Sequence, residues 1–346
     1  MLSLMVREIT HRFNPEMLVL VRESNGLTQS KLSSSIGCMS QAKISKIEEG
    51  VQEPTDNDIL QICNYFEKPS TFFFQASKAK VPNITFFRKR SSFPLKTLKY
   101  VDANMNIRRL IVEKLGQLFP LEGNPPFYDA STFSGDGSQV AKILRKEWNI
   151  QKGPIDDLAS LVEAKGIPIV MFDFGYGKLD GLTIRTESGF PIIFLNPSFP
   201  PSRLRFTLAH ELGHVVMHKE ISPEMEQEAS EFAGEFLMPE EDCKDSFYPV
   251  DIHKLIELKK QWGLSMQAIL KNGQRIKKIN DRYARFLWMQ IGKQGFRKSE
   301  PSEDEIPLVA PKLVTKLLEA FFTQYNGKEE DMLCSTRSEL KKAFSI

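Results

Sequence analysis

The sequence predicts an α+β chain that is mostly helical, and three observations support this fold class. Short apolar patterns of helical spacing, bounded by capping residues and glycines, fill residues 1–75. Two alternating apolar segments flank a Ser-Gly turn at residue 188 and predict a small sheet. A long apolar helix follows at residues 206–218, and helical patterns continue to the end of the chain. We therefore expect an N-terminal helical bundle, a small sheet beside a buried helix, and a helical C-terminal region.

The composition limits the classes of protein to which the chain can belong. The 346 residues are 41% hydrophobic and 26% charged, which is typical of a globular chain of two or three domains. No apolar run approaches the roughly 18 residues that a membrane-spanning helix needs, and no signal peptide pattern opens the chain. Four scattered cysteines without a C-x-x-C pair favour a reducing compartment. We therefore expect a cytoplasmic protein with no membrane partner.

Residues 1–75 are expected to form a bundle of four helices. These helices are predicted at residues 13–24, 27–37, 40–50 and 54–66. Asn14 and Pro15 are a typical helix start, and Thr28 and Gly37 are a typical cap and end. The apolar positions of the four segments recur at helical spacing and can form one small core.

The pattern Leu-Thr-Gln-x-x-Leu from residue 27, followed by Ile-Ser-Lys-Ile-Glu-x-Gly from residue 44, resembles the helix-turn-helix of Cro and lambda-type repressors, the xenobiotic-response-element family. In that fold the third helix enters the major groove of DNA. The resemblance implies five DNA-facing side chains: Gln29 at a phosphate, and Gln41, Ala42, Lys43 and Lys46 on the third helix. The turn at residues 37–40 is one residue longer than the usual form, so the register of the base-reading side chains stays open. A bundle that makes only protein contacts is the alternative.

Residues 76–137 are expected to be a basic linker and a connecting helix. Residues 76–101 contain lysine and arginine but no aspartate or glutamate, whereas the whole chain has a net charge of only +2. This asymmetry favours a nucleic-acid partner for the N-terminal half, although a solvated basic linker would have the same composition. The apolar stripe of a helix at residues 100–118 is a candidate seam for a homodimer. Residues 120–138 are rich in glycine, proline and serine and mark a domain boundary.

Residues 138–250 are expected to form a domain in which a small sheet precedes the long apolar helix. Helices are predicted at residues 140–148 and 155–164, a buried strand at 167–172, and a hairpin at 179–186 and 191–196. The edge strand of such a sheet can bind an extended peptide by backbone pairing.

The apolar helix contains His210-Glu211-Leu212-Gly213-His214, an H-E-x-x-H pattern. A spacing of four puts both imidazoles on one helical face, where they can bind one cation, and Glu211 can take a proton from a metal-bound water. Neutral imidazoles favour zinc, and burying these polar groups is costly unless they are paired or metal-bound. Gly213 indicates a close approach by another element. His218 lies too far along the helix to share the ion and is expected at the end of the helix or at the rim of the site. An amphipathic core helix with two satisfied histidines is the alternative.

A third metal ligand is expected on the following helix. Its apolar stripe consists of Ala229, Phe232, Ala233, Phe236 and Leu237. Projected at about 100° per residue, Glu226 lies beside that stripe and is the expected ligand. The remaining glutamates of the helix, Glu228, Glu231 and Glu235, are expected on its solvated face.

The run Arg-Phe-Thr-Leu-Ala-His-Glu-Leu-Gly-His, followed by Glu-x-x-Ala-x-x-Phe-Ala-x-x-Phe-Leu-Met-Pro, resembles the ImmA/IrrE family of zinc metallopeptidases. The resemblance implies a zincin-like domain, with His210, His214 and Glu226 as zinc ligands and Glu211 as general base. It also implies that the substrate is a transcriptional regulator, since members of this family cleave repressors.

Residues 251–346 are expected to be helical, with helices at 255–262, 265–278 and 282–291 and a last helix at 313–322. They carry no recognisable chemistry, so a packing role is expected. The sequence as a whole predicts a DNA-binding regulator with zinc endopeptidase activity. The alternatives are a non-catalytic regulator that uses the zincin fold as a sensor, and an antitoxin-like repressor.

Overall fold

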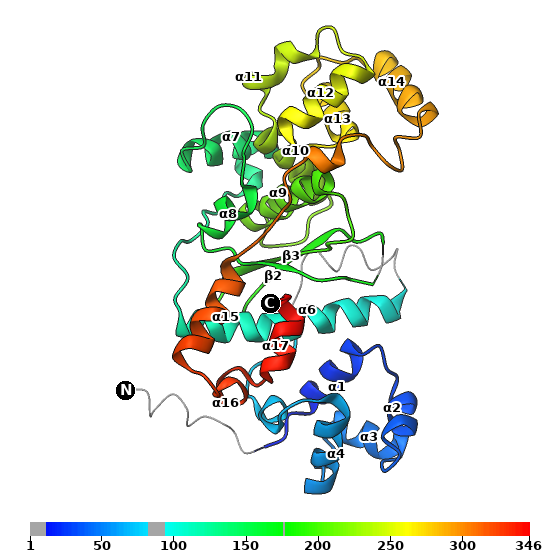
Figure 1. Ribbon diagram of the computed structural model, residues 1–346, viewed down its shortest axis with the longest axis vertical. Coiled ribbons are helices and arrows are strands. Elements are labelled where there is room, and N and C mark those ends of the chain that lie inside the picture. Colours follow the sequence, from blue (N-terminus) through cyan, green and yellow to red (C-terminus); the bar gives the residue numbers. More distant parts are fainter. Residues whose placement is uncertain (1–11, 82–93, 176) are drawn as a thin grey trace.

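A three-stranded sheet lies near the middle of the molecule, with helices stacked on both of its faces (Figure 1). The computed structural model describes residues 12–81, 94–175 and 177–346. Residues 82–93, part of the predicted basic stretch, lie outside this description. The predicted α+β, mostly helical fold is confirmed.

The N-terminal bundle has the four predicted helices. They are α1 (Pro15–Ser24), α2 (Gln29–Ile36), α3 (Gln41–Glu48) and α4 (Asp56–Phe66), followed by the 3₁₀ turn η1 (Ser70–Phe74). Each α-helix begins at a side-chain cap that accepts a backbone N–H of the first turn: Asn14, Thr28, Ser40 and Thr55. Gly37 ends α2 with a φ of 76°, a left-handed conformation that glycine adopts without strain.

The sheet consists of β1 (Ile169–Met171), β2 (Gly181–Arg185) and β3 (Pro191–Leu195) in the order β1-β3-β2. β1 is parallel to β3, and β2 is antiparallel to it, so the predicted hairpin is confirmed. Successive β3 residues face opposite sides because side chains alternate along a strand. Ile193 and Leu195 join one hydrophobic core, whereas Ile192 and Phe194 join the other.

The first core lies between the sheet and the helices drawn above it in Figure 1. The elements on this side are η3 (Ala130–Phe133), α7 (Gly137–Glu147), α8 (Leu158–Glu163), α9 (Pro201–Met217), α10 (Met225–Leu237), α11 (Glu240–Cys243), η4 (Lys244–Phe247), α12 (Ile252–Trp262), α13 (Met266–Arg275) and α14 (Asp281–Lys293). α9 packs on β2 and β3, and α10 lies against both α9 and α7.

The second core lies on the other face of the sheet and is built around α6 (Leu95–Leu118). Ile107, Leu110, Ile111 and Leu115 of α6 are buried within the chain. The prediction that this stripe forms a dimer seam is therefore wrong, because α1, α15 and α16 of the same chain pack against α6. An apolar stripe needs a partner, but the sequence does not say whether that partner belongs to the same molecule.

The C-terminal residues return to the N-terminal bundle. After η5 (Glu303–Glu305) come α15 (Leu313–Gln324), α16 (Glu329–Leu333) and α17 (Arg337–Phe344), so the helix predicted at 313–322 is not the last one. Lys68, which follows α4, pairs with Glu339 of α17, and Thr71 of η1 donates a hydrogen bond to the carbonyl of Glu330. In the described part of the chain, no helix is long and apolar enough to cross a membrane.

Candidate metal centre and nucleic-acid interface

Helix α9 carries the H-E-x-x-H pattern in the interior of the molecule. Its N-terminus is held by Glu303, whose carboxylate accepts hydrogen bonds from the backbone N–H and the hydroxyl of Ser202. The His210 and His214 Nε2 atoms lie 3.2 Å apart, as expected for residues one turn apart on one face. His214 is buried and His210 is partly exposed, so the pair lies at the edge of the core.

Helix α10 brings Glu226 to the two histidines. Its Oε2 lies 3.6 Å from His210 Nε2, and its Oε1 lies 3.7 Å from His214 Nε2. The close packing of the two helices depends on Gly213, because a Cβ there would lie 3.3 Å from the Ala229 Cα and 3.1 Å from the Phe232 ring. This explains the glycine in the middle of α9, where it lowers helix propensity.

The donor set fits a zinc ion. Ligand atoms bound tetrahedrally at about 2.0–2.1 Å lie about 3.3–3.4 Å from one another. The separations of 3.2, 3.6 and 3.7 Å between the two imidazoles and Glu226 are close to this value. Two imidazoles with one carboxylate are also a typical set for catalytic zinc. Ligand atoms of His210, Glu211 and His214 lie within 4.8 Å of one another, so Glu211 is beside the same point.

Glu211 is held against the sheet. Its side chain is buried, and Thr183 of β2 donates a hydrogen bond of 2.8 Å from Oγ1 to Glu211 Oε2. The β2 backbone approaches α9 closely at Gly181, where a Cβ would lie 3.2 Å from the Glu211 Cγ and 2.6 Å from the Thr207 methyl group. The carboxylate of Glu211 is therefore oriented by an edge strand of the sheet.

Both histidines have a partner on their second ring nitrogen. His210 Nδ1 lies 3.3 Å from the Ser230 hydroxyl. His214 Nδ1 lies 2.9 Å from His218 Nδ1, and His218 Nε2 lies 2.8 Å from Glu228 Oε2. Burial lowers the pKa of His218, and the Glu228 carboxylate opposes this shift. Such partners fix the orientation of an imidazole ligand.

Two expectations about glutamates on α10 are wrong. Glu228 is 8% exposed and Glu235 is 1% exposed, although both were expected on the solvated face. The reason is that α7 covers this side of α10, so closely that a Cβ at Gly137 would lie 2.0 Å from the Glu228 carbonyl oxygen. Glu235 instead forms an ion pair of 2.6 Å with Arg275 of α13. His218 lies at the end of α9, which is one of its two expected positions, but it is buried and does not lie at an exposed rim.

On the N-terminal bundle, Gln41, Ala42 and Lys46 of α3 are exposed. Lys43 differs from them, because its Nζ lies 2.7 Å from Asp58 of α4. Gln29 donates a hydrogen bond of 2.8 Å to Glu48 and accepts one of 2.9 Å from Gln41. Three of the five predicted DNA contacts, Gln29, Gln41 and Lys43, thus also have partners within the bundle.

Two parts of the chain match models of known families. Residues 162–272 match a peptidase family described as the IrrE N-terminal-like domain, and residues 19–73 match a helix-turn-helix family. The first match contains His210, Glu211, His214 and Glu226, and it continues past the boundary predicted at residue 250 into α13. The second contains all five predicted DNA-facing residues. No curated protein matches the chain.

Proposed function

Since the chain joins a helix-turn-helix domain to an IrrE N-terminal-like domain, we propose that it is a DNA-binding transcriptional regulator with zinc-dependent endopeptidase activity. The observation that carries the proposal is the convergence of His210, His214 and Glu226 on one point beside Glu211. A helix-turn-helix on the same chain favours a regulatory protein as the substrate. Four cysteines that form no disulfide agree with a location in the cytoplasm.

His210, His214 and Glu226 are the proposed zinc ligands. Bound zinc would lower the pKa of a coordinated water and polarise the carbonyl of a peptide bond. Ser230 and His218 orient the two imidazoles by contacting their Nδ1 atoms. Glu211 is the proposed general base, and the hydrogen bond from Thr183 fixes the direction from which its carboxylate takes a proton. The edge strand β2 is the proposed pairing site for an extended substrate backbone.

Replacing Glu211 by glutamine tests the peptidase. Glu211→Gln keeps the size of the side chain and a hydrogen-bonding partner for Thr183, so fold and zinc content should stay those of the wild type. Cleavage of the substrate should fall by about 10²–10⁴-fold, because the general base is gone. The measurement is comparison of new protein N-termini, by mass spectrometry, in cells that carry either form. Glu241→Gln, at an exposed position of α11, is the control.

The alternative is a regulator in which the metal centre senses a ligand. If Glu211→Gln cells show the same protein N-termini and the same transcription of target genes as wild-type cells, the peptidase is contradicted. The sensor function would then explain the zinc centre.

A further inference from the structure

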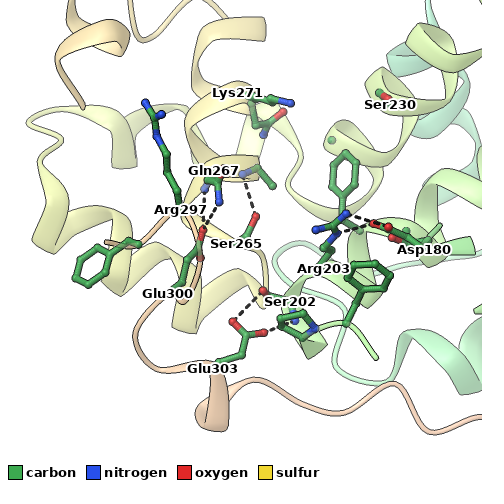
Figure 2. A pocket seen from close by; sticks show the side chains of 18 of the residues that line it. Asp180, Ser202, Arg203, Ser230, Ser265, Gln267, Lys271, Arg297, Glu300 and Glu303 are labelled. Carbon is green, nitrogen blue, oxygen red and sulfur yellow. Dashed lines mark hydrogen bonds and ion pairs between the residues drawn. The ribbon is translucent and has the colours of Figure 1, made fainter. Parts of the chain in front are cut away.

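A pocket of about 860 Å³ opens beside the proposed metal centre (Figure 2). Thr207, which lies on α9 one turn before Glu211, is in its wall, and so is Ser230, which contacts His210. Asp180, which directly precedes the edge strand β2, lines it as well. The pocket is therefore continuous with both the catalytic helices and the edge of the sheet.

The wall opposite α9 is held by buried ion pairs. Lys259 of α12 is fully buried and contacts the carboxylates of Glu300 and Glu303, both of which line the pocket. Glu300 also accepts a hydrogen bond of 2.8 Å from the backbone N–H of Met266, at the start of α13. Glu303 bonds Ser202 at the start of α9, as Figure 2 shows. Residues 296–303 are thus tied to three helices, which holds this wall of the pocket in place.

The charges of the lining do not cancel. Asp180 is paired with Arg203 at 2.5 Å, Glu300 and Glu303 are paired with Lys259, and Arg275 is paired with Glu235. Three further cations of the lining, Lys271, Arg297 and Lys298, are exposed, and none has a carboxylate within ion-pair distance among residues 12–81, 94–175 and 177–346. Glu231 is the one lining carboxylate in these ranges without a cation as partner. The far wall is consequently cationic.

Aromatic rings add an apolar surface to the pocket. Phe199, Phe206 and Phe296 line it. The guanidinium of Arg203 lies 4.2 Å from the centre of the Phe199 ring, which holds that ring in place. Rings of this kind bind large apolar side chains, and the volume is in the range of pockets that hold a few residues of a peptide.

We propose that this pocket selects the substrate, by binding a segment in which a large apolar or aromatic side chain is flanked by acidic residues. The inference rests on the proposed peptidase function, because it takes the substrate to be a peptide chain that continues from the metal centre. The aromatic lining receives the apolar side chain, and Lys271, Arg297 and Lys298 attract the acidic flank. A nucleic acid fits less well, because the lining also contains Glu231, whose carboxylate has no cation partner among the described residues and would repel phosphates.

The test measures binding without cleavage. Full-length, zinc-loaded Glu211→Gln protein is titrated into fluorescein-labelled peptides with phenylalanine at the centre, followed by three glutamates, three glutamines or three lysines. The acidic peptide should bind about tenfold more tightly than the glutamine peptide at low salt, and the lysine peptide more weakly than both. The preference should shrink as salt is raised, because the cations are exposed.

Charge-reversal variants test whether the cations of the pocket cause the preference for the acidic peptide. Lys271→Glu and Arg297→Glu should each remove most of the acidic preference, whereas Lys293→Glu, on α14 outside the pocket, should keep it. Two different pocket variants are used so that a folding defect in one leaves the other informative. Equal binding of the acidic and lysine peptides would overturn the inference, and so would an oligonucleotide that displaces the acidic peptide at lower concentration than unlabelled peptide does. If the acidic preference holds but the wild-type protein cleaves none of the peptides and no cellular protein, the peptidase fails while the selectivity of the pocket stands.

Discussion

Glu228 contacts His218, and His218 contacts His214, so a carboxylate and two imidazoles form a chain that ends at a proposed zinc ligand. Glu226, two residues earlier, lies directly beside both proposed histidine ligands. Glu231, on the same helix, accepts a hydrogen bond from the side chain of Gln227. Glu226 is the proposed ligand itself, Glu228 is linked to a ligand only through His218, and Glu231 contacts Gln227 instead, so the same substitution can compare all three.

Alanine substitutions should separate the three. Glu226→Ala should abolish stoichiometric zinc binding, because one of three protein ligands is lost. Glu228→Ala should weaken zinc binding by less than the about 10–100-fold that is usual for the direct partner of a histidine ligand, because Glu228 acts on His214 only through His218. Glu231→Ala should leave it unchanged. Competition with a zinc chelator measures all three, and a Glu228→Ala protein that holds zinc as tightly as Glu231→Ala would show that the chain of contacts has no effect on the metal.

The sequence predicted Glu226 but not the role of Glu228, for a physical reason. Projection of a helix shows which side chains lie beside its own apolar stripe, and the structure places Glu226 near both histidines. It contains no information about a second helix that covers the remaining surface. α7 covers Glu228, and the close approach depends on Gly137, which lies in the predicted domain boundary at residues 120–138. Burial of His218 follows from the same packing.

At the scale of elements, the sequence predicted those features that depend on residues close together in the chain. The caps Asn14 and Thr28 and the hairpin of β2 and β3 were predicted because a capping side chain, a turn glycine and an alternation of period two act within a few residues. α6 was predicted as a helix, but its partners were not. α16 and α17 were missed, because five and eight residues without a strong apolar stripe give little signal.

Helix α3 yields a prediction that separates DNA contact from folding. Lys46→Ala should keep the melting temperature and weaken binding to duplex DNA, and it should reduce the salt dependence by about one counterion. Lys43→Ala should lower stability by about 1–3 kcal/mol, because Asp58 is buried and loses its cation. Thermal unfolding and a fluorescence titration at several salt concentrations measure both effects. Equal loss of DNA binding without loss of stability in both variants would show that Lys43 leaves Asp58 to contact DNA.

At the scale of the whole molecule, the expected division into successive domains does not describe how the chain packs. Residues 251–346 were expected as one helical region, yet α12–α14 belong to the core that contains α9, whereas α15–α17 belong to the core that contains α6 and the N-terminal bundle. Lys68 and Glu339 are paired across 271 positions of sequence. Contacts between residues so far apart in sequence depend on the path of the whole chain, and no local sequence pattern predicts them.

Because α15 and the N-terminal bundle share one core, we expect a destabilising substitution in α15 to destabilise the bundle as well. Leu318 is fully buried in the core around α6, so Leu318→Ala should cost about 2–5 kcal/mol. Leu308→Ala is the matched control, because Leu308 is 78% exposed and its truncation should change stability by less than about 0.5 kcal/mol. Hydrogen exchange of Leu318→Ala should increase in α1, α6 and α15, and less in α9 and α10, which lie in the other core. If the increase is confined to α15–α17, the C-terminal helices only cover the molecule, and they do not couple the DNA-binding bundle to the rest of the fold.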